Sequence, residues 1–119
     1  MANAEDRGYQ FKFLGWMKEG TSDKVWGYIK LDSGSYYNFW GRRGKTLRFK
    51  RHTGHWRDWE LDNLAQKKLD KGYKKLNESE IEVISPGFAE EFGNQFIMAK
   101  FSGTIMTDDT SDDSGNSFI

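Results

Sequence analysis

Apolar and polar residues alternate through the first half of the chain in the way that is typical of β-strands. The alternation predicts four strands, near residues 9–13, 25–31, 36–40 and 46–51. Turns rich in Gly, Ser and Asp separate them, at residues 20–23, 32–35 and 41–44. Because these connections are too short for parallel crossovers, we expect an antiparallel meander.

One helix is predicted after the four strands. Leu61, Leu64, Ala65 and Leu69 fall at i, i+3, i+4 and i+8, which gives an apolar stripe that should pack on one face of the sheet. Gly72 stands where a left-handed C-terminal cap belongs. The sequence does not fix the first residue of the helix, since Thr53, His55 and Asp58 could each cap it.

The second half of the chain predicts further strands. Residues 78–84 alternate three glutamates with Ile81 and Val83, and residues 95–106 give a last strand or two, bent at Gly103. These could extend the sheet, form a dimer contact, or both. The expected fold class is therefore α+β: an antiparallel sheet of four or more strands, one helix packed across one face, and extra C-terminal strands. We expect one domain over residues 1–106, with its core at 21–76 and an extension at 77–106.

Composition narrows the class of protein. The 119 residues suit a single domain, and the chain has no cysteine, so neither disulfides nor thiolate metal sites are available. No apolar run approaches the ~18 residues of a membrane span, and the first residues are polar and acidic, unlike a signal peptide. We therefore expect an intracellular, cytoplasmic protein.

Charge is distributed unevenly, although the formal net charge is zero. Residues 36–75 hold twelve Lys and Arg against four Asp and Glu, whereas residues 76–119 hold one Lys against nine acids. Binding responds to the local field of a face rather than to the total. The sequence thus predicts a basic module, suited to a polyanion, followed by an acidic part.

The stretch 37–45 combines an aromatic strand with a basic, Gly-rich turn. A tryptophan beside guanidinium groups can stack on a base or sugar while the cations hold phosphates. The candidate nucleic-acid-binding residues are Trp40, Arg42, Arg43, Lys45, Arg48, Lys50, Arg51, Tyr36, Trp56, Lys67, Lys71 and Lys74, with Lys75 beside them. We expect Tyr36 or Trp56 to be exposed and to assist Trp40. Whether Arg51 lies on the same face as the other basic residues of its strand is left open.

Two structural alternatives stay open for these residues. Trp40 can be a core or sheet-face aromatic. The lysines near the helix end can serve the helix dipole and solubility alone.

Three short motifs resemble a WGR domain, the module of DNA-dependent poly(ADP-ribose) polymerases and of assorted bacterial proteins. Asp23-Lys24-Val25-Trp26 is similar to the family's opening strand, Trp40-Gly41-Arg42-Arg43-Gly44 to its name-giving motif, and Lys68-Leu69-Asp70-Lys71-Gly72-Tyr73 to its helix end. The resemblance spans about residues 21–76. It implies a sheet crossed by one helix and a non-catalytic nucleic-acid-binding role, with Trp40 against a nucleotide and Arg42 at the DNA or partner contact.

The chain also departs from that family. It runs at once into Lys45-Thr46-Leu47 where the family often has a second Gly-containing turn. About 20 residues before the motifs and 40 after them are not covered, and nothing resembles an ADP-ribosyl transferase domain. Sensing of strand breaks coupled to catalysis is therefore not implied.

Residues 107–119 are acidic, lack periodicity and are predicted to be a disordered tail. The tail carries Asp108, Asp109, Asp112 and Asp113 and ends in Phe118 and Ile119. It resembles the C-terminal tails of bacterial and phage single-stranded-DNA-binding proteins, in which acids compete with DNA and the apolar end docks on partners. A tethered acidic segment would screen the basic surface until a polyanion displaces it. The alternative is a tail that only promotes solubility.

The other candidate chemistry is weak. His52 and His55 lack a third ligand, so we expect no metal site. Glu78, Glu80 and Glu82 fit the wet face of a strand better than acid–base catalysis. We expect no enzyme and no cofactor, but a DNA-binding protein (single strands or strand ends), an accessory of phage or bacterial replication or repair. The alternative is a protein-interaction module that binds and modulates a host enzyme, and a homodimer is open in either case.

Overall fold

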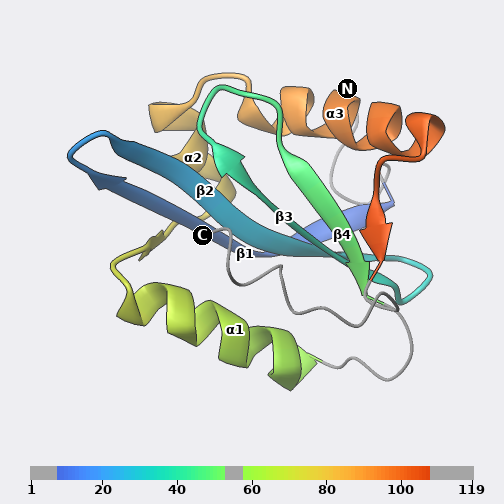
Figure 1. Ribbon diagram of the computed structural model, residues 1–119, viewed down its shortest axis with the longest axis horizontal. Helices are drawn as coiled ribbons and strands as arrows, with labels where there is room; N and C mark the ends of the chain where they lie inside the picture. The colour runs from blue at the N-terminus through green and yellow to red at the C-terminus, as the bar shows by residue number, and fades with distance from the viewer. Residues whose placement is uncertain (1–7, 53–57, 108–119) are drawn as a thin grey trace.

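The computed structural model describes residues 8–52 and 58–107 and shows an α+β fold (Figure 1). Its elements are β1 (Tyr9–Glu19), β2 (Ser22–Leu31), β3 (Tyr36–Arg42), β4 (Arg48–His52), α1 (Asp58–Asp70), β5 (Lys74–Lys75), α2 (Glu78–Ile84), α3 (Phe88–Ser102) and β6 (Met106–Thr107). The strands form one sheet in the order β5-β1-β2-β3-β4-β6. Every neighbouring pair is antiparallel except β4 and β6. The predicted four-stranded meander is confirmed.

Helices cover both faces of the sheet, whereas the sequence predicted one helix on one face. Figure 1 shows α1 on one side and α3 on the other, with α2 beside α3. Each face has its own core. Trp26, Leu61 and Trp40 belong to the core under α1, whereas Phe39 and Phe92 belong to the core under α2 and α3. The described part of the fold is therefore three layers, with the sheet in the middle.

An irregularity in β1 sends its aromatic residues to both faces. The pairing of β1 with β2 shifts register between Phe11 and Phe13, which marks a β-bulge. Phe11 consequently packs with the core under α3, while Phe13 belongs to the core under α1. A regular strand over residues 9–13 would instead place Tyr9, Phe11 and Phe13 on a single face.

The predicted helix after β4 is confirmed as α1. Leu61 and Ala65 are buried, and Gly72 has φ of +112°, the left-handed conformation expected beyond the helix end. Thr53 and His55, two of the three candidate caps, lie outside the described residues. None of the described helices is long and apolar enough to cross a membrane.

The strand predicted at residues 78–84 is wrong, because this segment is helix α2. A capping box starts the helix: the Asn77 side chain accepts a hydrogen bond from the Glu80 backbone N–H at 2.8 Å, and the Glu80 carboxylate accepts one from the Asn77 N–H at 2.8 Å. Ile81 is its buried residue. Over seven residues, the alternation of glutamates with Ile81 and Val83 fitted a strand as well as a single buried helical position.

The C-terminal strands predicted within 95–106 are also wrong for most of that range, because α3 extends to Ser102. Phe88, Phe92 and Phe96 recur every fourth residue and are buried together, with the Phe92 and Phe96 ring centroids 6.2 Å apart. The expected bend at Gly103 is the C-cap of α3, with φ of +72°. Within the described residues, only the two-residue β6 follows. The division into a domain at 1–106 and a tail stays a prediction, since residues 108–119 lie outside the described part.

Candidate nucleic-acid interface

Trp40 lies in the core under α1 rather than on the surface. Its exposed fraction is 3 %, and its backbone pairs with Trp26 on β2 and Arg48 on β4. Tyr36, which we expected to be exposed, is buried at 6 %, and Trp56 lies outside the described residues. In this conformation neither described ring offers a face to a nucleotide, so the structural alternative for Trp40 accounts for its position.

Gly41, which follows Trp40, lets the backbone turn closely against the next loop. Its φ is +153°, and a Cβ at this position would meet the Leu47 side chain at 3.1 Å. The next residue, Arg42, is exposed, and its guanidinium donates to the Thr21 carbonyl at 2.8 Å. Arg42 also lies opposite Lys24 in the β2–β3 pairing, which brings two cations to one end of the sheet.

Arg43 binds the protein itself. Its guanidinium donates to both carboxylate oxygens of Asp23, at 2.8 and 2.6 Å, and to the Ile84 carbonyl at 2.6 Å. The Trp16 indole N–H donates to the same carboxylate at 2.8 Å. The Arg43 hydrogen bond, followed by the Trp16 hydrogen bond, holds the pKa of Asp23 at about 2 although burial opposes this, and Asp23 in turn raises the pKa of Arg43. Arg43 thus joins β2, the β3–β4 loop and α2, and its predicted phosphate contact would compete with these bonds.

The basic residues of β4 do not form one surface. Arg48 pairs with Trp40 and Lys50 with Asn38, so both lie on the α1 side of the sheet. Arg51 pairs with Tyr37 and lies on the α3 side, as we had left open. Arg48, Arg51 and the loop residue Lys45 are exposed, but Lys50 is buried at 7 %.

Lysines gather at the C-terminal end of α1. Lys67, Lys71 and Lys74 are exposed there, as predicted, and Lys75 on β5 is exposed beside them. The prediction missed Lys68, which is only 2 % exposed, although its spacing of seven residues from Leu61 places it on the buried stripe. Burial, then the charges of Lys71 and Lys24, lower the pKa of Lys68 to about 8. Lys71 and Lys24 thus act on Lys68 as like charges.

Five glutamates lie on the side of the sheet opposite α1. Glu78, Glu80, Glu82, Glu90 and Glu91 belong to α2 and α3, whereas the lysine cluster belongs to α1 and the adjoining strand ends (Figure 1). Glu80 completes the cap of α2, and the Glu82 carboxylate accepts the N–H groups of Gly87 and Ala89, each at 2.8 Å. These two glutamates therefore serve helix ends. Helices α2 and α3 therefore form a mainly acidic layer, whereas α1 carries four acids, Asp58, Glu60, Asp62 and Asp70, together with its lysines.

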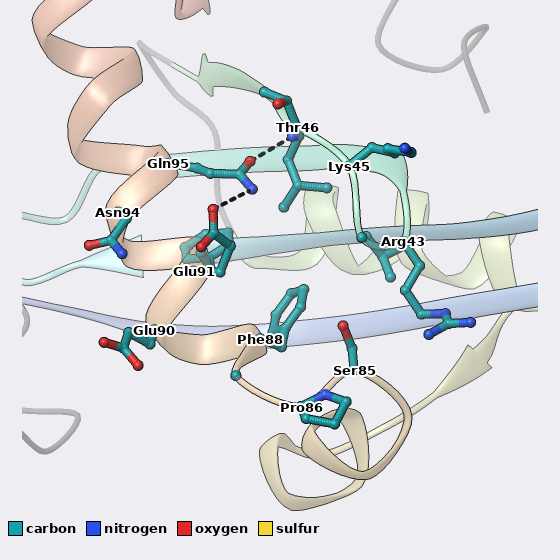
Figure 2. Close-up of a pocket in the computed structure, with 15 residues that line it drawn as sticks. Arg43, Lys45, Thr46, Ser85, Pro86, Phe88, Glu90, Glu91, Asn94 and Gln95 are labelled. Atoms are coloured by element: carbon teal, nitrogen blue, oxygen red, sulfur yellow. Dashed lines mark hydrogen bonds between the residues drawn. The ribbon is translucent and has the colours of Figure 1, made fainter.

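A groove of about 730 Å³ separates the β3–β4 loop from α3. Figure 2 shows Arg43 and Lys45 on one side of this groove and Glu90 and Glu91 on the other. The Gln95 side chain bridges it, accepting the Leu47 N–H at 2.7 Å. The glutamates would repel phosphates, so the groove suits a nucleic acid less well than the lysine cluster does.

The described residues contain no group of three or more His, Asp or Glu side chains that could hold a metal ion. His52 is buried at 6 %, and His55 lies outside the described part. Comparisons with protein-family models, with curated proteins and with solved structures give no match to this chain.

Proposed function

We propose that the chain is a non-catalytic nucleic-acid-binding protein that holds the phosphates of a DNA strand or strand end at the lysine cluster. This cluster consists of Lys24, Arg42, Lys67, Lys68, Lys71 and Lys74. The observation that supports the proposal most is the position of Lys68, a residue that is 2 % exposed and whose charge is affected by two other lysines. Like charges brought together at a stability cost favour a binding role, because strain of this kind is usual at functional sites.

The contact proposed here differs from the one the sequence suggested. Stacking on Trp40 is replaced by phosphate contacts, since the ring is buried. Such contacts are insensitive to base sequence and strongly dependent on salt. The acidic layer formed by α2 and α3 would face away from the strand and orient the protein on it. An accessory role in phage or bacterial replication or repair, in the cytoplasm, fits a DNA ligand of this kind.

The test is fluorescence anisotropy with a labelled single-stranded oligonucleotide at several salt concentrations. We expect the logarithm of affinity to fall linearly with the logarithm of salt, with a slope of about −0.7 per phosphate contacted. Lys71→Gln and Lys74→Gln should each weaken binding and reduce the slope by about one contact. Lys100→Gln, an exposed lysine on α3, is the matched control and should change little. Absence of binding at low salt, or equal losses in all three variants, would refute the proposal.

A second candidate function, a protein-interaction module, is favoured by one specific observation. The outer face of α3 exposes three large apolar side chains, Ile97 at 54 %, Met98 at 65 % and Phe101 at 85 %. An exposed apolar strip of this kind is typical of a protein contact surface. If the contact is a homodimer, light scattering should show twice the chain mass, and Phe101→Ser should return the monomer. A wild-type mass equal to one chain would exclude the homodimer at the concentration tested.

A further inference from the structure

Lys68 is a buried cation whose described contacts are aromatic. Its Nζ lies 5.6 Å from the Trp26 ring centroid and 6.0 Å from the Tyr73 ring centroid. Within residues 8–52 and 58–107, no carboxylate or carbonyl accepts a hydrogen bond from this ammonium. Aromatic faces attract a cation, but they do not replace an acceptor. The lysine side chain is thus packed against two aromatic rings, and the residue is 2 % exposed.

The same two rings carry further donors without a partner. Trp26 Nε1 and Tyr73 Oη are buried, and neither forms a hydrogen bond in the described part of the protein. Burial raises the pKa of Tyr73 to about 12, so its hydroxyl keeps its proton at neutral pH. Two such donors therefore belong to the rings packed against Lys68, and the ammonium of Lys68 is a third. Buried polar groups are normally satisfied, and leaving several unsatisfied together is costly.

We propose that Lys68, Trp26 and Tyr73 form a binding site for a phosphate group, reached at the C-terminal end of α1 beside Lys24 and Lys71. A phosphate offers three or four acceptor oxygens and one to two negative charges, which matches three donors and the nearby cations. The Lys68 stem has four carbons, so its ammonium can move toward the entering group while the stem stays packed. This inference rests on the proposed function, since it assigns that ligand's phosphate to particular residues.

Position in the fold supports the site. Lys71 is exposed and Lys24 half-buried, so the approach to Lys68 is bordered by positive charge. Gly72 turns the chain with φ of +112°, and the Tyr73 N–H donates to the Lys68 carbonyl at 3.0 Å. This turn fixes the Tyr73 ring beside the lysine. A phosphate at the site would therefore be held by elements on both sides: α1 with its terminal turn, and β2.

The first test uses inorganic phosphate as the probe and the full chain as the protein. The Trp26 indole N–H resonance, assigned with Trp26→Phe, is followed in ¹⁵N-labelled protein, with chloride titrated at matched ionic strength. We expect a saturable shift with phosphate only. Lys68→Met should abolish the shift, and Lys100→Met should retain it. Tyr73→Phe keeps the ring and removes the hydroxyl, and should weaken binding about 3- to 10-fold.

Two results would overturn the site: an equal shift with chloride, or an unchanged phosphate shift in Lys68→Met. The remaining indole resonances report whether each variant is folded. If Lys68→Met loses its native spectrum, the double variant Tyr73→Phe with Lys71→Met is tested in its place. An undiminished phosphate affinity in that pair would equally overturn the proposal.

Oligonucleotides then distinguish the source of the phosphate and separate this inference from the proposed function. Strands with a 5′-phosphate, a 3′-phosphate or hydroxyl ends are compared on wild type and Lys68→Met. A preference of about tenfold for a phosphorylated end, lost in the variant, assigns the site to a terminal phosphate, whereas an equal loss with all three assigns it to the backbone. Equal binding of every strand by both proteins overturns the site but leaves the proposed function standing. A response to inorganic phosphate without binding of any strand supports the site but overturns the proposed function.

Discussion

Replacing Lys68 by methionine should stabilise the protein, which is unusual for a substitution inside a core. Methionine has a similar length and fills irregular space, so the packing against Trp26 and Tyr73 is kept while the charge is removed. The residue is 2 % exposed, and its burial disfavours the charged form of the side chain. Most core substitutions destabilise by 0.5–3 kcal/mol or so, so a gain would stand out clearly.

The magnitude follows from the lowered pKa. Burial, with Lys71 and Lys24, lowers the pKa of Lys68 from 10.5 to about 8. Since one pKa unit corresponds to about 1.4 kcal/mol, the charge destabilises the fold by about 3 kcal/mol at pH 7. Loss of the cation–aromatic attraction to the two rings offsets about 1 kcal/mol of this in the variant. We therefore expect Lys68→Met to raise the free energy of unfolding by about 2 kcal/mol.

The pH dependence gives the sharper test. Between pH 8 and 10.5 the unfolded chain holds more protons on Lys68 than the folded protein does, so wild-type stability rises with pH in this window. Lys68→Met lacks this contribution. The stability gap between the two proteins should therefore shrink by about 2 kcal/mol from pH 7 to pH 9.5.

Urea denaturation followed by circular dichroism at both pH values measures this gap. Lys67→Met, an exposed neighbour on the same helix, is the control and should stay within about 0.5 kcal/mol of wild type. A less stable Lys68→Met at pH 7, or a gap independent of pH, would refute the reasoning.

Three further predictions concern other parts of the chain. Asp23→Asn should lower stability by about 2 kcal/mol at pH 7, and its difference from wild type should vanish as pH falls from 4 to 2, where the carboxylate held by Arg43 is protonated; denaturation at several pH values checks this. Trp40→Phe should destabilise by about 1–3 kcal/mol yet bind an oligonucleotide within about twofold of wild type, and a tenfold loss in the folded variant would restore the stacking role. Truncation after Thr107 should tighten binding several-fold in low-salt anisotropy and leave it unchanged at high salt, whereas equal affinities at low salt would indicate a tail that only promotes solubility.

The strands of the first half could be predicted because each feature there is local. Turn residues and alternation mark β2 and β3 within a few residues of their observed ends. The bulge after Phe11 could not be predicted, because it depends on which face each ring finds a partner. The strands predicted for the second half were wrong for a different reason. A seven-residue helix such as α2 has too few turns for its periodicity to be distinguished from the alternation of a strand.

The helix α3 could have been found from its phenylalanines. Phe88, Phe92 and Phe96 repeat at four-residue spacing, but a strand assignment that begins at residue 95 leaves two of the three outside the pattern. For the site, the basic composition predicted the exposed lysines but not the burial of Lys50 and Lys68. Trp40 and Arg43 show this limit best. A ring and a guanidinium suited to a nucleotide are equally suited to a core and to an internal ion pair, and only packing decides between them.

The cost of burying Lys68 and the proposed phosphate site are two aspects of one equilibrium. A phosphate that pairs with the ammonium would restore the pKa of Lys68 toward its usual range, and by linkage would recover part of the free energy that burial of the charge costs. Recovery of the full amount, about 3 kcal/mol, would correspond to roughly a hundredfold in affinity. The same reciprocity means that Lys68→Met should gain stability and lose phosphate affinity together. If the variant gained stability with no loss of affinity, the buried charge would be a defect of packing rather than part of a site.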